Sequence, residues 1–133
     1  MTFHLACSAS AGPDPGGSAN LAYIGKSDRL LCVLNRVYLT SKDLVSVYTE
    51  GGPYGMPIVQ LTFTAQGAAR LASFTQENLD REMVLVLDGE ILLVANIMAP
   101  ITGGRMQITG KRSQDDTRKL VEHIQQAIRQ PGN

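Results

Sequence analysis

Apolar residues dominate the segment from residue 81 to residue 110, and their spacing predicts a three-stranded antiparallel meander. The Asp88-Gly89 dipeptide separates two apolar runs, which favours a tight hairpin because both central positions of a type I′ turn need positive φ. The run from Met83 to Leu87 is apolar at every position, as expected of a central strand. After a second turn at Thr102–Gly104, Met106 to Thr109 alternates like a strand with one face in water.

The rest of the chain predicts shorter strands, helices and two flexible loops. Strands are expected where apolar residues cluster or alternate, at Phe3 to Cys7, Arg29 to Leu39 and Ile58 to Thr64. Three helices are expected. The first is short, is capped by Thr40 or Ser41 and ends before Glu50. The second covers Gln66 to Leu79, and the last is capped by Ser113. Segments 8–20 and 50–57 are rich in Gly and Pro and predict flexible loops.

These elements indicate an α+β fold with a mainly antiparallel sheet, a C-terminal meander and two to three helices packed on one face. Strands are followed by helices without regular βαβ repetition, and the longest run of strands is antiparallel. A chain of 133 residues is long enough for one core and predicts a single domain over residues 1–133.

Charge and apolar content narrow the class of partner. Lys plus Arg and Asp plus Glu number 12 each, so the formal net charge is zero and no global basic field exists for nucleic acid or anionic membranes. No window approaches the roughly 20 apolar residues that span a bilayer. We therefore expect no nucleic acid partner and no membrane insertion by this chain. Since no signal peptide is recognisable at the N-terminus, the protein is either intracellular or an exported one supplied without its signal.

Cys7 and Cys32 are too few for a disulfide framework and have no C-x-x-C spacing. The simplest interpretation is two buried thiols, since free cysteine is among the most buried residue types. If the strands that hold the two cysteines pair, a single disulfide becomes possible, which would require an oxidising compartment. The sequence leaves both interpretations open.

The titratable residues form no catalytic pattern. His4 falls in an apolar strand and His123 opposite the apolar stripe of the last helix, and no acidic or thiol partners stand at zinc-ligand spacing. The turn explains Asp88 without catalysis. We therefore expect no enzyme activity, no metal and no cofactor. The remaining enzyme alternative would act through Asp88, Glu90 and His123.

Apolar residues on both sides of the strand after the Asp-Gly turn give the clearest functional signal. They are Ile91, Leu92, Leu93, Val94, Ile97 and Met98. Helices cover only one face of a single-layer sheet, and large exposed apolar patches usually mark a binding surface. Alternatively, a loop such as Ser8 to Asn20 folds over the second face, or a homodimer buries it.

The order of several motifs resembles the head part of the first periplasmic domain of SecD and SecDF, membrane proteins that assist protein export. The motifs are LTSKDL, then Gln66-Gly67-Ala68-Ala69, Phe74-Thr75 with Asn78, LVLDGEI, and ITGGRMQITG before a helix. The resemblance covers nearly the whole chain. It implies a non-enzymatic head module on the outer face of the inner membrane that contacts emerging polypeptide, without the motor that lies in the family's transmembrane helices. Asn96 stands where the family usually has proline.

The expected function is therefore a non-enzymatic protein-binding module of the bacterial cell envelope. A specific version is an immunity-type protein that neutralises a secreted toxin. The alternative is an accessory factor or detached head for protein export that binds unfolded chains. The partner is another protein in either case, and the expected location is the periplasm, with the cytoplasm as the alternative. The residues expected to contact the partner are Tyr54, Met56, Ile91, Leu93, Asn96 and Met98.

Overall fold

The computed structural model describes residues 1–8, 16–24, 26–51, 57–108 and 114–129. The strands in these ranges are β1 (Thr2–Leu5), β2 (Ser18–Tyr23), β3 (Lys26–Leu34), β4 (Leu39–Thr40), β5 (Leu44–Gly51), β6 (Pro57–Phe63), β7 (Glu82–Leu87), β8 (Glu90–Asn96) and β9 (Arg105–Ile108). The helices are α1 (Ala65–Glu77) and α2 (Gln114–Arg129), and a single 3₁₀ turn, η1, spans Ser41–Asp43. The predicted α+β class is confirmed.

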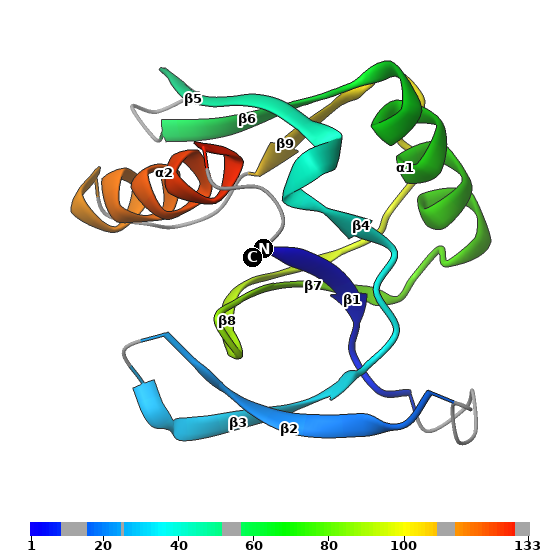
Figure 1. The fold of residues 1–133 in the computed structure, drawn as a ribbon, viewed down its shortest axis with the longest axis vertical. Coiled ribbons are helices and arrows are strands. Elements are labelled where there is room, and N and C mark those ends of the chain that lie inside the picture. Colours follow the sequence, from blue (N-terminus) through cyan, green and yellow to red (C-terminus); the bar gives the residue numbers. More distant parts are fainter. Residues whose placement is uncertain (9–15, 25, 52–56, 109–113, 130–133) are drawn as a thin grey trace.

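The strands form two sheets rather than one (Figure 1). The larger sheet has the order β3-β2-β8-β7-β1-β4, and the smaller one has the order β5-β6-β9. All pairings are antiparallel except the one between β2 and β8. In Figure 1 the smaller sheet lies above the β1, β7 and β8 layer, with α1 at one end and α2 at the other.

The β7–β8 hairpin forms as predicted, but the third strand of the meander does not join it. Asp88 and Gly89 have φ values of 52° and 80°, as a type I′ turn requires. In contrast, β9 pairs with β6 of the other sheet, where the Phe63 N–H donates to the Gly104 carbonyl at 2.9 Å. The predicted three-stranded meander was therefore wrong at its last strand. The segment 97–104 between β8 and β9 is too long for a tight hairpin and carries the chain to the other sheet.

The short helix predicted after Thr40 is also wrong beyond its first turn. Thr40 caps η1, and the Asp43 carboxylate accepts a hydrogen bond from the Thr40 N–H at 3.0 Å. The chain then continues as β5, in the sequence LVSVYTEG. Valine, threonine and tyrosine favour a strand over a helix because branched and aromatic side chains lose χ1 freedom in a helix. Thr40 therefore acts as a cap, as predicted, but the element that it caps is a single 3₁₀ turn.

The other two predicted helices are confirmed. In α1, the Thr64 hydroxyl accepts a hydrogen bond from the Gly67 N–H at 2.9 Å and begins the helix. Leu71, Phe74 and Thr75 are its buried face. In α2 three residues of the apolar stripe, Leu120, Ile124 and Ala127, are buried, as is Thr117. Ser113, the predicted cap of this helix, lies outside the described residues.

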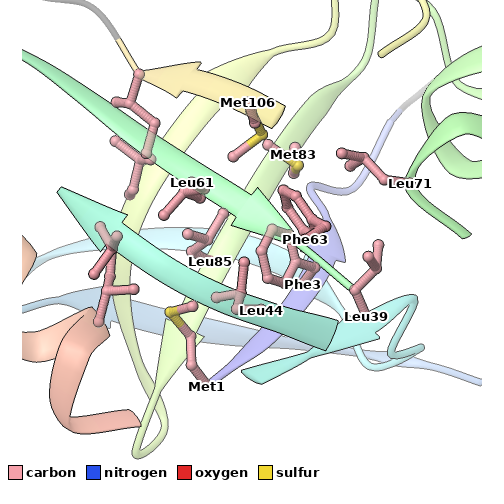
Figure 2. Close-up of a cluster of buried hydrophobic side chains, with 14 of the residues drawn as sticks. Met1, Phe3, Leu39, Leu44, Leu61, Phe63, Leu71, Met83, Leu85 and Met106 are labelled. Atoms are coloured by element: carbon pink, nitrogen blue, oxygen red, sulfur yellow. The ribbon is translucent and has the colours of Figure 1, made fainter. Parts of the chain in front are cut away.

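The larger hydrophobic core lies between the two sheets. Figure 2 shows side chains from β6 and β9 pointing toward those of β1 and β7. Phe3 and Phe63 meet edge to face, with ring centroids 6.0 Å apart. Leu71 of α1 and Leu120 of α2 belong to the same core, so this core holds both sheets and both helices together.

A second, smaller hydrophobic cluster covers the other face of β7 and β8. It consists of Ala6, Val33, Val84, Val86 and Ile91, with side chains of the β2–β3 hairpin packed against it. The β7–β8 register shifts between Leu85 and Val86, so β8 carries one extra residue there, Leu92. Leu92 and Leu93 therefore both contact the larger core, while their neighbours on either side contact the smaller cluster. The apolar residues on both faces of β8 are thus packed against protein on each side.

A disulfide joins Cys7 to Cys32, with the two Cα atoms 5.4 Å apart. Beside it, Ala6 pairs with Val33, and the Cys7 N–H donates to the Cys32 carbonyl at 3.0 Å. The chain just after β1 therefore pairs with β3, the strand at the far edge of the larger sheet. The five strands β3, β2, β8, β7 and β1 thus enclose the smaller cluster. The interpretation as two buried thiols was wrong, because the strands that hold the cysteines pair.

In the described part of the chain, neither helix has the length and apolar character required to cross a bilayer.

Candidate functional site

The six residues expected to contact a partner do not form one surface. Ile91 is 1% exposed inside the smaller cluster, and Leu93 is 5% exposed in the larger core. Neither side chain offers surface to a partner in this structure. The β2–β3 hairpin covers Ile91 on the face of β8 that was expected to be open, and Leu93 lies on the other face, in the core between the two sheets. Tyr54 and Met56 lie outside the described residues.

Asn96 and Met98 are exposed at the end of β8, and Met98 is 77% exposed. Between them, Ile97 is buried and pairs through its backbone with the turn after α1. Its N–H donates to the Arg81 carbonyl at 2.9 Å, and its carbonyl accepts from the Asp80 N–H at 2.8 Å. Leu79 in the same turn is also exposed. The role of Asn96 and Met98 in partner binding stays a prediction.

A groove lies where the ends of β5 and β6 pass over α2, which is on the left of Figure 1. Its volume is about 550 Å³, within the range of ligand-binding clefts. Its lining includes Thr49 and Gly51 of β5, Pro57 of β6, and Arg118, Val121 and Glu122 of α2. This groove brings together segments that are far apart in the sequence.

The amphipathic character of α2 explains why polar and apolar groups share the groove. Leu120 and Ile124 bury their side chains in the core, so Val121 is half-buried at its edge and Arg118 and Glu122 are exposed. On the strand side, the Gln60 amide donates to a Glu50 carboxylate oxygen at 3.3 Å. The groove therefore has an apolar base with charged side chains along its rim.

The guanidinium of Arg118 is already engaged within α2. It contacts the Asp115 carboxylate at 2.5 Å and the Glu122 carboxylate at 3.6 Å. The hydrogen bond from Arg118 lowers the pKa of the Asp115 carboxyl below its usual value. Lys119 also contacts the Asp115 carboxylate, at 3.6 Å, so the two cations and two carboxylates of this α2 cluster balance one another in charge. The Glu50 carboxylate then gives the rim of the groove one net negative charge.

The groove was missed in the sequence because its two sides are more than 60 residues apart and one of them was assigned to a helix. The exposed residues of α2 looked like an ordinary solvated face. A strand assignment for residues 44–51 would have shown only that one side of the groove is a strand, and not that α2 packs against it.

The structure does not bring the residues of the enzyme alternative together. Asp88 and Glu90 are exposed at the β7–β8 turn, while His123 lies on α2. That helix packs chiefly against β5, β6 and η1. Among the described residues, no group of three or more His, Cys, Asp or Glu side chains is arranged to hold a metal ion.

A model of the SecDF P1 head subdomain matches residues 19–127 of the chain. The chain belongs to the SecDF P1 head subdomain family. This match confirms the resemblance inferred from the order of the motifs. It covers most of the larger sheet, all of the smaller sheet, α1 and most of α2.

Individual relatives agree with the family. The protein translocase subunit SecD of Acidaminococcus fermentans is 37% identical over 86 residues, which cover 65% of this chain and 20% of that protein. The protein translocase subunit SecDF of Thermus thermophilus is 33% identical over 83 residues, which cover 62% of this chain and 11% of that protein. For the SecD of Rhodobacter capsulatus the identity is 27% over 124 residues, which cover 91% of this chain and 22% of that protein. The chain thus spans about a fifth or less of the length of these family members.

Two solved structures share the fold of this P1 head. A crystal structure of SecDF in its super-membrane-facing form has a TM-score of 0.67 at 21% identity, and the match covers 96% of this chain and 19% of that one. A second structure, of a membrane component SecDF that enhances protein export, has a TM-score of 0.65 at 20% identity and covers 96% of this chain and 62% of that one. The two-sheet architecture is therefore that of known SecDF structures.

Proposed function

We propose that this chain is a periplasmic, non-catalytic head module of a protein-export machinery, and that it binds exported polypeptides while they are unfolded. The observation that carries the proposal is the family match over residues 19–127, together with relatives that are protein translocase subunits. In this proposal the whole chain, residues 1–133, acts as a single head domain that belongs with export components. A homodimer is not required for it.

Two features of the structure support this proposal. The Cys7–Cys32 disulfide suits an oxidising compartment such as the periplasm. The groove at α2 and the open edge of β5 offer contact to an extended chain rather than a pocket for one small substrate. These relatives favour the export alternative over the toxin-neutralising hypothesis, for which they give no support.

A binding experiment with one protein in two states tests the proposal. The probe is a disulfide-containing secreted protein, used in its native form and after reduction and alkylation with a neutral amide group, which keeps it unfolded. We expect micromolar affinity for the unfolded form, about −8 kcal/mol, and no binding to the native form at the same concentrations. Fluorescence anisotropy of the labelled probe measures both.

Equal affinity for the two forms, or no affinity for the unfolded one, would overturn the proposed function. A tight one-to-one complex with a single folded envelope protein would also contradict it and would favour the immunity-type hypothesis. A labelled, permanently unfolded polypeptide of unrelated sequence serves as the control for breadth, because a head that serves many exported proteins should bind it with similar affinity.

A further inference from the structure

Strand β5 is the longest free edge among the described strands of the smaller sheet. It pairs with β6 on one side only and runs for eight residues, LVSVYTEG. Proteins usually protect such edges with lysine, proline or very short strands. The other edge of this sheet, β9, is only four residues long and begins with Arg105, and β5 contains no lysine, arginine or proline.

The hydrogen bonds of β6 show which backbone groups of β5 face outward. The Phe63 N–H bonds to the β9 side, at Gly104, and the Thr64 N–H bonds to the β5 side, at Asp43. Because backbone groups alternate in direction along a strand, Thr62 and Gln60 also bond toward β5. Their partners there are Ser46 and Tyr48.

The residues between those partners therefore point their N–H and C=O groups away from β6. They are Val47 and Thr49, which stand opposite Leu61 and Val59, two β6 residues that bond toward β9. Gly51 continues the same alternation along β5 and stands opposite Pro57. Thr49 and Gly51 are exposed and line the groove. The outward backbone groups at this end of β5 thus lie at the groove beside α2.

Side chains along β5 also suit an added strand. Val45 is 57% exposed and Tyr48 is 39% exposed, so apolar surface flanks the free edge. Val121 of α2 supplies an apolar contact on the groove side. An extended segment in this position would alternate its side chains, one set toward Val121 and the other toward solvent.

We propose that an extended segment of an unfolded polypeptide adds to β5 as an extra strand, in the groove between β5 and α2. This inference rests on the proposed function and names the surface that carries it out. Backbone hydrogen bonds supply sequence-tolerant affinity, which is how edge-strand recognition works in general. The Glu50 carboxylate at the rim favours segments with lysine or arginine among their solvent-facing side chains.

Gly51 offers a way to block the groove without disturbing the fold. A Cβ atom built on Gly51 meets nothing within 4 Å, and its φ is not in the left-handed region. By alternation along β5, its side chain would lie on the same side as that of Val47, which is buried toward the core. A Gly51→Gln side chain therefore fills the groove from the strand side. A Cβ atom built on Gly103 also meets nothing within 4 Å, and Gly103 lies in the connection between β8 and β9. Gly103→Gln is therefore the matched control.

A second pair of variants tests the backbone directly. Thr49→Pro removes the outward N–H, and proline is tolerated at edge strands when its missing N–H faces solvent. Gln107→Pro removes an outward N–H from β9, the opposite edge of the same sheet, and is the control. Thermal unfolding and circular dichroism establish that all four variants are folded before binding is compared.

The experiment is a titration of each full-length variant with the reduced, amide-alkylated probe. We expect Gly51→Gln to weaken binding at least tenfold and Thr49→Pro to weaken it severalfold, while Gly103→Gln and Gln107→Pro bind like the unchanged protein. With a probe of net positive charge, affinity should also fall as salt is raised, because salt screens its attraction to the Glu50 carboxylate at the rim.

Unchanged affinity in a folded Gly51→Gln variant, with the parent protein binding the unfolded probe, would overturn the β5 site and leave the proposed function standing. Equal losses in Gly51→Gln and Gly103→Gln would also overturn the site. Failure of the parent protein to bind the unfolded probe would overturn the proposed function and this inference together.

Discussion

Removing the Cys7–Cys32 disulfide should weaken the enclosure of the smaller hydrophobic cluster. The bond links residues 25 apart and ties the end of β1 to β3, which forms one side of that cluster. In the loop-entropy model, a cross-link of this span stabilises the fold by about 3.5 kcal/mol at 25 °C through its effect on the unfolded chain. At roughly 3–5 °C per kcal/mol for a chain of this size, the melting temperature should fall by about 10–17 °C.

The assay is thermal and urea unfolding of a Cys7→Ser, Cys32→Ser double variant beside the parent protein. Reductant should lower the stability of the parent toward that of the double variant and should leave the double variant unchanged, which is the control for other effects of the reductant. A loss below about 1 kcal/mol in the double variant would refute the reasoning. The β2–β3 hairpin would then be held by strand pairing and by packing of the smaller cluster alone.

Two further predictions concern single residues in the larger sheet and at the start of α1. A Cβ on Gly67 would lie 2.5 Å from the Asp43 carbonyl oxygen and 2.8 Å from the Asp43 Cβ, so Gly67→Ala should cost about 1–3 kcal/mol in urea unfolding despite alanine's better helix propensity. Gly103→Ala, where the added methyl meets nothing within 4 Å, should change stability little, and equal effects of the two substitutions would contradict this explanation. Burial lowers the pKa of His4 in the folded protein, so the unfolded chain binds a proton at His4 more readily than the folded protein does. The contribution of neutral, buried His4 to the stability of the fold is therefore present above pH ~6.5 and is lost as the pH falls through and below that value. The difference in stability between the parent protein and His4→Gln should therefore depend on pH between about 7.5 and 5, and a constant difference would count against it.

The features that sequence predicted best are those set by local chemistry. The Asp88-Gly89 turn and the apolar stripe of α2 depend on a few neighbouring residues, and both are found in the structure. The cap at Thr40 was correct as a local feature and misleading about length, because nothing in the cap specifies how far the helix continues.

Long-range pairing explains what the sequence did not predict. The pattern of Met106 and Ile108 is the same whether β9 pairs with β8 or with β6, since alternation indicates a buried face but not a partner strand. Likewise, apolar residues on both faces of β8 predicted an open binding surface, with cover by a loop or a homodimer as the alternative. Nothing in that pattern indicated that the β2–β3 hairpin would supply the second cover. A period-two pattern also does not reveal the extra residue at Leu92, because the bulge depends on how β8 pairs with β7.

The candidate groove was out of reach of sequence because it depends on the packing of α2 beneath β5. Its rim combines Glu50 and Glu122, whose separation in the chain gives no sign that they share a surface. The family resemblance carried the functional expectation, and the structure adds the strand edge on which an extended chain is proposed to pair.

Amide hydrogen exchange of the protein with and without the unfolded probe tests this account most directly. In the free protein, the Ser46 and Tyr48 amides should be protected by β6, while the Thr49 amide on the free edge exchanges fast. Saturation with the unfolded probe should slow exchange at Thr49 by about tenfold or more and leave Gln107, on the opposite edge of the same sheet, unchanged. Binding of the probe with no added protection at Thr49, or with protection at Gln107 instead, would contradict the account.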